Sequence, residues 1–148
     1  IEVTLNPVIT IKNFKELPDY MLRVAALKKI KFISLSIVQP RGRAWVNKGL
    51  VPDYKVIGPY VKKALLIGNK LGLVINNPYC GLPACVGGWY KYPQNCVEYC
   101  ESFIGKKDNN VDKIKAPFCS KCTFNAFCNG VWKEYAEIHG FSGLKPLK

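Results

Sequence analysis

Cysteine is confined to one part of this 148-residue chain, and this constrains the fold more than any other feature. All seven cysteines lie between positions 80 and 128, and the first 79 residues contain none. A chain of this length can bury a core without covalent links. The odd number of cysteines also argues against a disulfide framework, and we expect no secretory leader. We therefore expect free thiols at a local site, in a protein of the reducing cytoplasm.

Charge and hydropathy limit the function classes. The apolar runs, such as ISLSIV and ALLIG, are far shorter than the ~20 residues of a membrane helix, so we expect a soluble protein without a membrane partner. The formal net charge is +12, and most of the excess lies in the cysteine-free half. Such a surface attracts nucleic acid, acidic peptides or phosphorylated molecules, or only keeps the protein soluble. Nucleic acid is possible as a partner but is not favoured.

The first half alternates between strand and helix patterns. β-Branched residues predict a first strand, interrupted at Asn6 and Pro7, and apolar spacing predicts a helix after it. A second strand stops at Pro40, a second helix opens at Pro59, and a third strand follows Gly72. The five expected elements cover residues 1–11, 17–29, 29–40, 59–72 and 71–78.

This order predicts an α/β fold with parallel strands, open or closed into a barrel. In such folds, ligand-binding and catalytic residues usually lie at the carboxyl ends of the strands. Asn6, the loop 39–47 and the segment 76–80, which ends at Cys80, are therefore expected on one face. Arg41 and Arg43 in that loop are candidates to grip a carboxylate or phosphate of a bound cofactor or substrate. We place a domain boundary between residues 79 and 80.

Three cysteines are close together near the end of the chain. Cys119, Cys122 and Cys128 are spaced C-x2-C-x5-C, and a helix is expected over residues 129–140, with Gly140 as its cap. A C-x2-C turn points two thiolates at one metal in both zinc and iron-sulfur sites. The fourth ligand must come from elsewhere in the chain.

Two assignments of the fourth ligand remain open. Cys80 could join Cys119, Cys122 and Cys128 around one cluster. Alternatively, Cys96 and Cys100 could pair with Cys119 and Cys122 around a zinc ion. Cys85 is most simply a buried, inert thiol.

Other catalytic patterns have little support. The chain has a single histidine, His139, and it lies in the last expected helix without a nucleophile motif nearby. The chain contains no P-loop, no G-x-G-x-x-G and no H-E-x-x-H motif. The sequence therefore gives little support to a nucleotide-binding protein or a metalloprotease of the usual kinds.

The stretch CSKCTFNAFCNGVWKEYAEIHG resembles the auxiliary-cluster region, of SPASM and Twitch type, of radical S-adenosylmethionine (radical SAM) enzymes. SLSIVQPRGRAW and NNPYC resemble the last α/β units of the partial barrel of those enzymes. The resemblance implies a partial (β/α) barrel segment over residues 1–79 and a small domain over 80–148 that binds an auxiliary 4Fe-4S cluster. It also implies a peptide or small-molecule substrate.

The chain departs from the family pattern in two places. The C-x3-C-x2-C motif that holds the S-adenosylmethionine-cleaving cluster is absent, since Phe103 follows Cys96 and Cys100 where a third cysteine would stand. S-adenosylmethionine is therefore expected only in the complete enzyme, with a missing N-terminal portion or a partner chain. The fuller SPASM pattern would also place a cysteine at Trp132.

The resemblance thus implies a one-cluster arrangement with Cys80, Cys119, Cys122 and Cys128 as ligands. A second cluster would use Cys80, Cys85 and Cys96, with Cys100 as a substitute fourth ligand. Two other functions stay open: a zinc-binding interaction or nucleic-acid-binding module, and a stand-alone iron-sulfur electron carrier.

Overall fold

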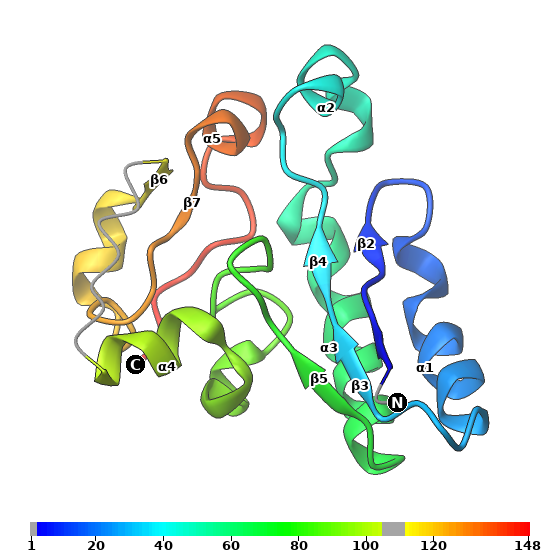
Figure 1. The fold of residues 1–148 in the computed structure, drawn as a ribbon. Coiled ribbons are helices and arrows are strands. Elements are labelled where there is room, and N and C mark those ends of the chain that lie inside the picture. Colours follow the sequence, from blue (N-terminus) through cyan, green and yellow to red (C-terminus); the bar gives the residue numbers. More distant parts are fainter. Residues whose placement is uncertain (1–2, 105–111) are drawn as a thin grey trace.

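The first half of the chain alternates between short parallel strands and helices, of which α1 and α3 are the long ones (Figure 1). The computed structural model describes residues 3–104 and 112–148. The expected order of strand, helix, strand, helix and strand is confirmed, although Asn6–Pro7 and Leu35 each divide a strand in two. The elements are β1 (Thr4–Leu5), β2 (Val8–Ile9), α1 (Leu17–Ala26), β3 (Phe32–Ser34), β4 (Ser36–Ile37), α2 (Arg43–Val46), α3 (Tyr54–Lys70) and β5 (Val74–Asn76).

The strands form two open parallel sheets. β3 lies between β1 and β5, and β2 pairs with β4. Leu5, Ile33 and Ile75 are in register across the larger sheet. A Cβ on Gly68 of α3 would lie 2.5 Å from Cδ1 of Ile75, so the missing side chain lets this helix pack closely on the strand. Over the described residues, the strands do not close into a barrel.

Helix α3 begins five residues before the position expected from the sequence. Asp53 is its N-cap, and its side chain accepts a hydrogen bond from the Lys55 amide at 2.7 Å. This cap stabilises the first turn, and Pro59 therefore lies inside the helix. The expectation that Pro59 opens the helix was wrong, because the Asp53 cap starts the helix at Tyr54.

In the described part of the cysteine-rich segment, the elements are short and the strands form one two-stranded sheet. A helix was expected over residues 129–140, but Trp132 lies in a strand and the helix starts one residue later. The strand forms because Val131 and Trp132 pair with Ile114 and Lys113. The elements are the 3-10 helices η3 (Trp89–Lys91), η4 (Pro93–Asn95) and η5 (Pro117–Lys121), then α4 (Val97–Phe103), β6 (Lys113–Ile114), β7 (Val131–Trp132) and α5 (Lys133–His139).

Hydrogen bonds connect helix α5 and the residues after it to the start of α3. The Tyr135 hydroxyl donates to the Ser142 carbonyl at 3.2 Å, and the Ser142 hydroxyl donates to Asp53 at 2.9 Å. His139, the last residue of α5, contacts the Val51 carbonyl through Nε2 at 2.9 Å. The single histidine thus joins two parts of the fold, and one hydrophobic core continues across the boundary proposed at residue 80.

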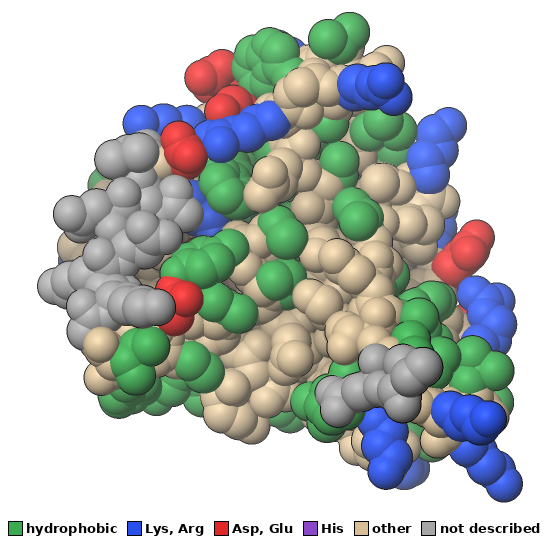
Figure 2. Space-filling view, in the orientation of Figure 1, with side chains coloured by type: hydrophobic (Ala, Val, Ile, Leu, Met, Phe, Trp, Pro, Cys, Tyr) green, Lys and Arg blue, Asp and Glu red, His purple; other side chains and the backbone are tan. Residues whose placement is uncertain are grey.

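In Figure 2, most charged side chains lie near the edges of the view. Lys and Arg side chains gather at the margins of this face, and its centre consists mainly of hydrophobic side chains, other uncharged side chains and backbone. No helix of the described segments has the length and apolar character required to cross a membrane.

Candidate metal centre

Four cysteines line one cavity in the C-terminal region. Cys85 comes from the loop after β5, Cys119 from η5, Cys122 from the end of η5, and Cys128 from the turn before β7. The cavity is narrow, with a volume of about 20 Å³. The other lining side chains are mainly apolar, among them Phe124, Leu144 and Leu147.

Local backbone geometry turns three of these cysteines toward the cavity. The Cys122 amide donates to the Cys119 carbonyl at 3.0 Å, which closes the C-x2-C turn. Gly130 has φ +88°, and a Cβ there would lie 2.1 Å from the Ile114 carbonyl oxygen. Only glycine therefore fits where the strand β7 approaches β6, and this close approach fixes the position of Cys128.

Backbone amides donate to the sulfur atoms of three cavity cysteines. The Leu147 amide lies 3.4 Å from Sγ of Cys122, and the Gly130 amide lies 3.4 Å from Sγ of Cys128. The backbone amide of Lys145 hydrogen bonds to Cys85. Such donors favour the thiolate, which is the form that binds a metal. The cavity is thus built around sulfur, and the segment 144–147 forms one of its walls.

Burial favours the neutral thiol at two of the cavity cysteines, Cys85 and Cys128. Burial raises the pKa of the Cys85 thiol to about 11, against the opposing effect of the Lys145 amide. Burial also raises the pKa of Cys128, and the negative charge of Glu98 adds to that effect. A bound metal would reverse this balance, since coordination deprotonates a thiol.

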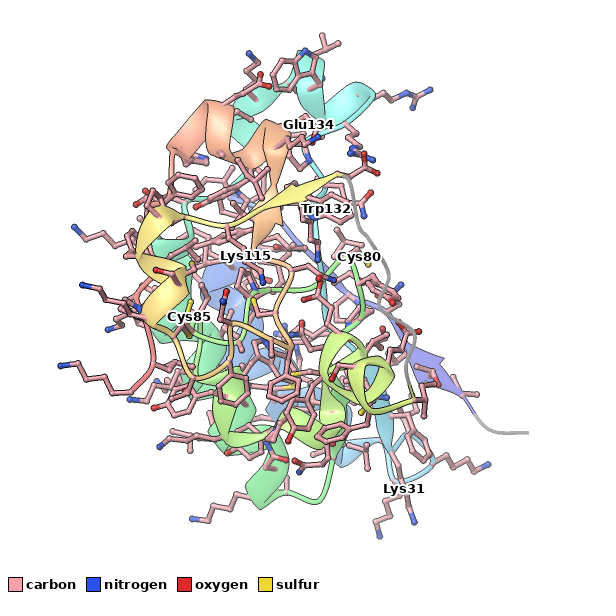
Figure 3. The ribbon with its side chains drawn as sticks, turned by 90° about the vertical axis from the view of Figure 1, so that its left-hand side faces the viewer. Lys31, Cys80, Cys85, Lys115, Trp132 and Glu134 are labelled. Carbon is pink, nitrogen blue, oxygen red and sulfur yellow. The ribbon has the colours of Figure 1, made fainter. Side chains whose placement is uncertain are left out.

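Cys80 lies at a different place from the four cavity cysteines. Its Sγ donates to the Ser36 hydroxyl at 3.2 Å, and that hydroxyl donates to Asn6 at 2.7 Å. Asn6 and Cys80, which the sequence predicts on one face, are thus connected through Ser36. Figure 3 shows Cys80 and Cys85 well separated in that view. Cys85 takes the place among Cys119, Cys122 and Cys128 that the sequence suggested for Cys80.

Cys96 and Cys100 belong to helix α4 and have protein partners of their own. Cys96 is the N-cap; it accepts a hydrogen bond from Asn77 at 3.6 Å and donates to the Tyr92 carbonyl at 3.6 Å. Burial raises its pKa to about 11. Cys100 is exposed and donates to the Gln94 carbonyl at 3.2 Å. Neither residue lines the four-cysteine cavity.

The described side chains do not form a ready-made site for one metal ion. In residues 3–104 and 112–148, no group of three or more His, Cys, Asp or Glu side chains is arranged to hold one metal ion. The zinc assignment with Cys96, Cys100, Cys119 and Cys122 and the second-cluster set with Cys80, Cys85, Cys96 and Cys100 both stay predictions.

Arg41, the candidate anion-binding residue, is already paired with carboxylates. Its guanidinium contacts Glu134 at 2.9 Å and Asp112 at 3.1 Å, and it lies over the Trp132 ring at 5.0 Å. The hydrogen bond that Arg41 donates to the Asp112 carboxylate raises the pKa of Arg41 and lowers the pKa of Asp112. Trp132 and Glu134 lie on adjacent elements in Figure 3. Arg41 thus joins the first half to the last, while Arg43 is exposed at the start of α2.

The sequence did not indicate a second contact between these regions. Lys113 is nearly buried and pairs with Glu98, donates to the Tyr79 carbonyl at 2.8 Å and lies over the Trp132 ring at 4.8 Å. The second carboxylate oxygen of Glu98 accepts from the Asn129 amide at 3.0 Å. No local spacing rule connects Glu98 to Lys113, because the two residues are 15 positions apart in the sequence.

Comparison of the chain with protein-family models, with curated proteins and with solved structures found no match.

Proposed function

We propose that this chain binds an auxiliary 4Fe-4S cluster through Cys85, Cys119, Cys122 and Cys128, as the C-terminal region of a radical S-adenosylmethionine enzyme. The observation that supports the cluster is the cavity that these four cysteines line. The assignment differs from the one suggested by the sequence in one ligand, because Cys85 replaces Cys80.

The four cysteines supply a donor set that suits a cluster. Four thiolates commonly hold an iron-sulfur cluster, and they also hold structural zinc. The preference for iron over zinc therefore rests on the sequence resemblance, and the four-cysteine lining of one cavity supports the choice of ligands.

The chain would supply the surroundings that tune such a cluster. Amides of Leu147, Gly130 and Lys145 donate to ligand sulfurs, and these bonds stabilise the negative charge of the thiolates. Phe124, Leu144 and Leu147 give the cavity an apolar lining. With four cysteine ligands, a bound cluster supplies one-electron transfer or structural support rather than an open iron site.

The remaining parts of the proposal rest on the sequence resemblance. The parallel α/β half agrees with a partial barrel segment, and radical generation would need the missing N-terminal portion or a partner chain. S-adenosylmethionine and a peptide or small-molecule substrate would then bind in the complete enzyme.

The test is metal analysis of protein purified without oxygen, with variants at two cysteines. We expect a brown protein with about four irons and four sulfides per chain. Cys85→Ala should lose most of the iron, and the matched variant Cys80→Ala should retain it. Loss of iron in Cys80→Ala alone would restore the original ligand set. A colourless, zinc-loaded protein would overturn the cluster proposal and favour a zinc-binding module.

A further inference from the structure

A second hollow lies on the surface behind Cys85. Its volume is about 550 Å³, within the range of small-molecule sites. One wall is the first half of α3, from Tyr54 to Lys62, and the other walls are the segments 85–90 and 143–145. We refer to this hollow as the basic groove.

The charges that line the basic groove have one sign. Lys55, Lys62 and Lys145 line it and are exposed, and no Asp or Glu is among the lining residues. Within the described part of the chain, none of the three forms an ion pair. Three ammonium groups around one concave surface create a positive potential that attracts anions.

Two glycines leave parts of the groove wall without side chains. Gly88 has φ +84° and Gly143 has φ +80°, a region that other residues rarely adopt. A Cβ on Gly143 would lie 2.4 Å from the backbone nitrogen of Lys55, so a larger residue could not approach α3 as closely. Backbone without side chains lets a ligand come near the main chain.

We infer that the basic groove binds a small polyanion, a molecule with two or more phosphate or carboxylate groups. The concave shape and volume fit a small molecule better than a flat protein surface. Lysine is a common partner for phosphate and interacts with it as a point charge. Tyr90, which is 39% exposed, adds an aromatic wall.

The groove and the four-cysteine cavity share a wall. Cys85, Leu144 and Lys145 line both hollows. A polyanion in the groove would therefore lie against the outer side of Cys85. The inference itself needs no cluster, because the lysines and glycines are present with or without metal.

The test is isothermal titration calorimetry of the full chain at low salt, with ADP, pyrophosphate, citrate and adenosine as probes. We expect binding of at least one of the three polyanions, weakening as salt is raised, and no binding of adenosine. Comparison of ADP and pyrophosphate with citrate distinguishes phosphate from carboxylate recognition. Running the titration on iron-loaded and iron-free protein separates this inference from the proposed cluster.

Two matched double variants locate the binding. Lys62→Glu with Lys145→Glu should weaken binding by about tenfold or more. Lys63→Glu with Lys70→Glu makes the same change in net charge on exposed α3 positions outside the groove and should leave affinity nearly unchanged. The milder Lys62→Gln should weaken binding in folded protein. Absence of binding by every polyanion, or equal weakening in both double variants, would overturn the inference.

Discussion

The hydroxyl of Tyr135 accepts a hydrogen bond from the backbone amide of Tyr54 at 2.9 Å, and the two rings stack with centroids 3.8 Å apart. The pair connects α5 to the first turn of α3, in a part of the core where both side chains are buried. The Tyr54 amide has no carbonyl partner at a helix start, so this hydroxyl satisfies it.

Tyr135→Phe should destabilise the fold. The variant keeps the stacked ring but leaves the Tyr54 amide without its acceptor, at a cost of about 1–3 kcal/mol. Urea unfolding of the two proteins measures the difference. Tyr90→Phe changes the same atom on a more exposed ring and should cost much less; equal losses in the two variants would contradict a specific role for the hydroxyl.

Gly130→Ala should be more harmful than Gly72→Ala. Both glycines have positive φ, so alanine costs about 1–2 kcal/mol at either position. At Gly72 the new Cβ meets nothing within 4 Å, whereas at Gly130 it meets the Ile114 oxygen at 2.1 Å. Urea unfolding should show the larger loss for Gly130→Ala, and under the cluster proposal iron content should fall in that variant alone.

Removal of residues 144–148 should loosen the metal centre. Leu144 and Leu147 line the cavity, and the Leu147 amide donates to Cys122. Without this wall, we expect lower iron content after anaerobic purification and faster bleaching of the visible spectrum in air. Removal of Lys148 alone, an exposed residue, is the control. Unchanged bleaching in the longer truncation would show that the segment does not protect the site.

Cys122→Ala and Cys100→Ala distinguish a ligand from a bystander. Cys122 lines the cavity, while exposed Cys100 donates to a backbone carbonyl. We expect iron to fall steeply in Cys122→Ala and to stay near the wild-type value in Cys100→Ala. If iron fell equally in both, α4 would have to contribute a ligand, and the four-cysteine set would be incomplete.

Arg41→Gln should have a small effect on stability. The guanidinium is well paired, but its side chain is 38% exposed, so the loss should be below about 1 kcal/mol. Urea unfolding at low and high salt measures it, and salt should shrink the difference from wild type. Exposed Arg43→Gln is the control and should have almost no effect. A loss of several kcal/mol in Arg41→Gln would mean that the contact to Glu134 holds the two regions together.

Sequence reasoning succeeded where periodic patterns decide the structure. The alternation of Ile33 and Leu35 with serines, and the apolar face of α1, predicted the parallel α/β half correctly. It did not indicate that Cys85, rather than Cys80, lines one cavity with Cys119, Cys122 and Cys128. Cys80 and Cys85 follow the same strand within a few residues, and only the path of the loop after β5 brings Cys85 to Cys128. Such a path depends on long-range packing, which local spacing does not encode.

The cavity joins cysteines that are far apart in the sequence, and this has a consequence for the unfolded chain. Cys85 lies before α4, and Cys119 lies after β6. Metal bonds to both would act as a crosslink that closes the intervening segment into a loop. Closing a loop reduces the entropy of the unfolded state, so iron loading should slow unfolding and raise the denaturant midpoint even where no native contact changes.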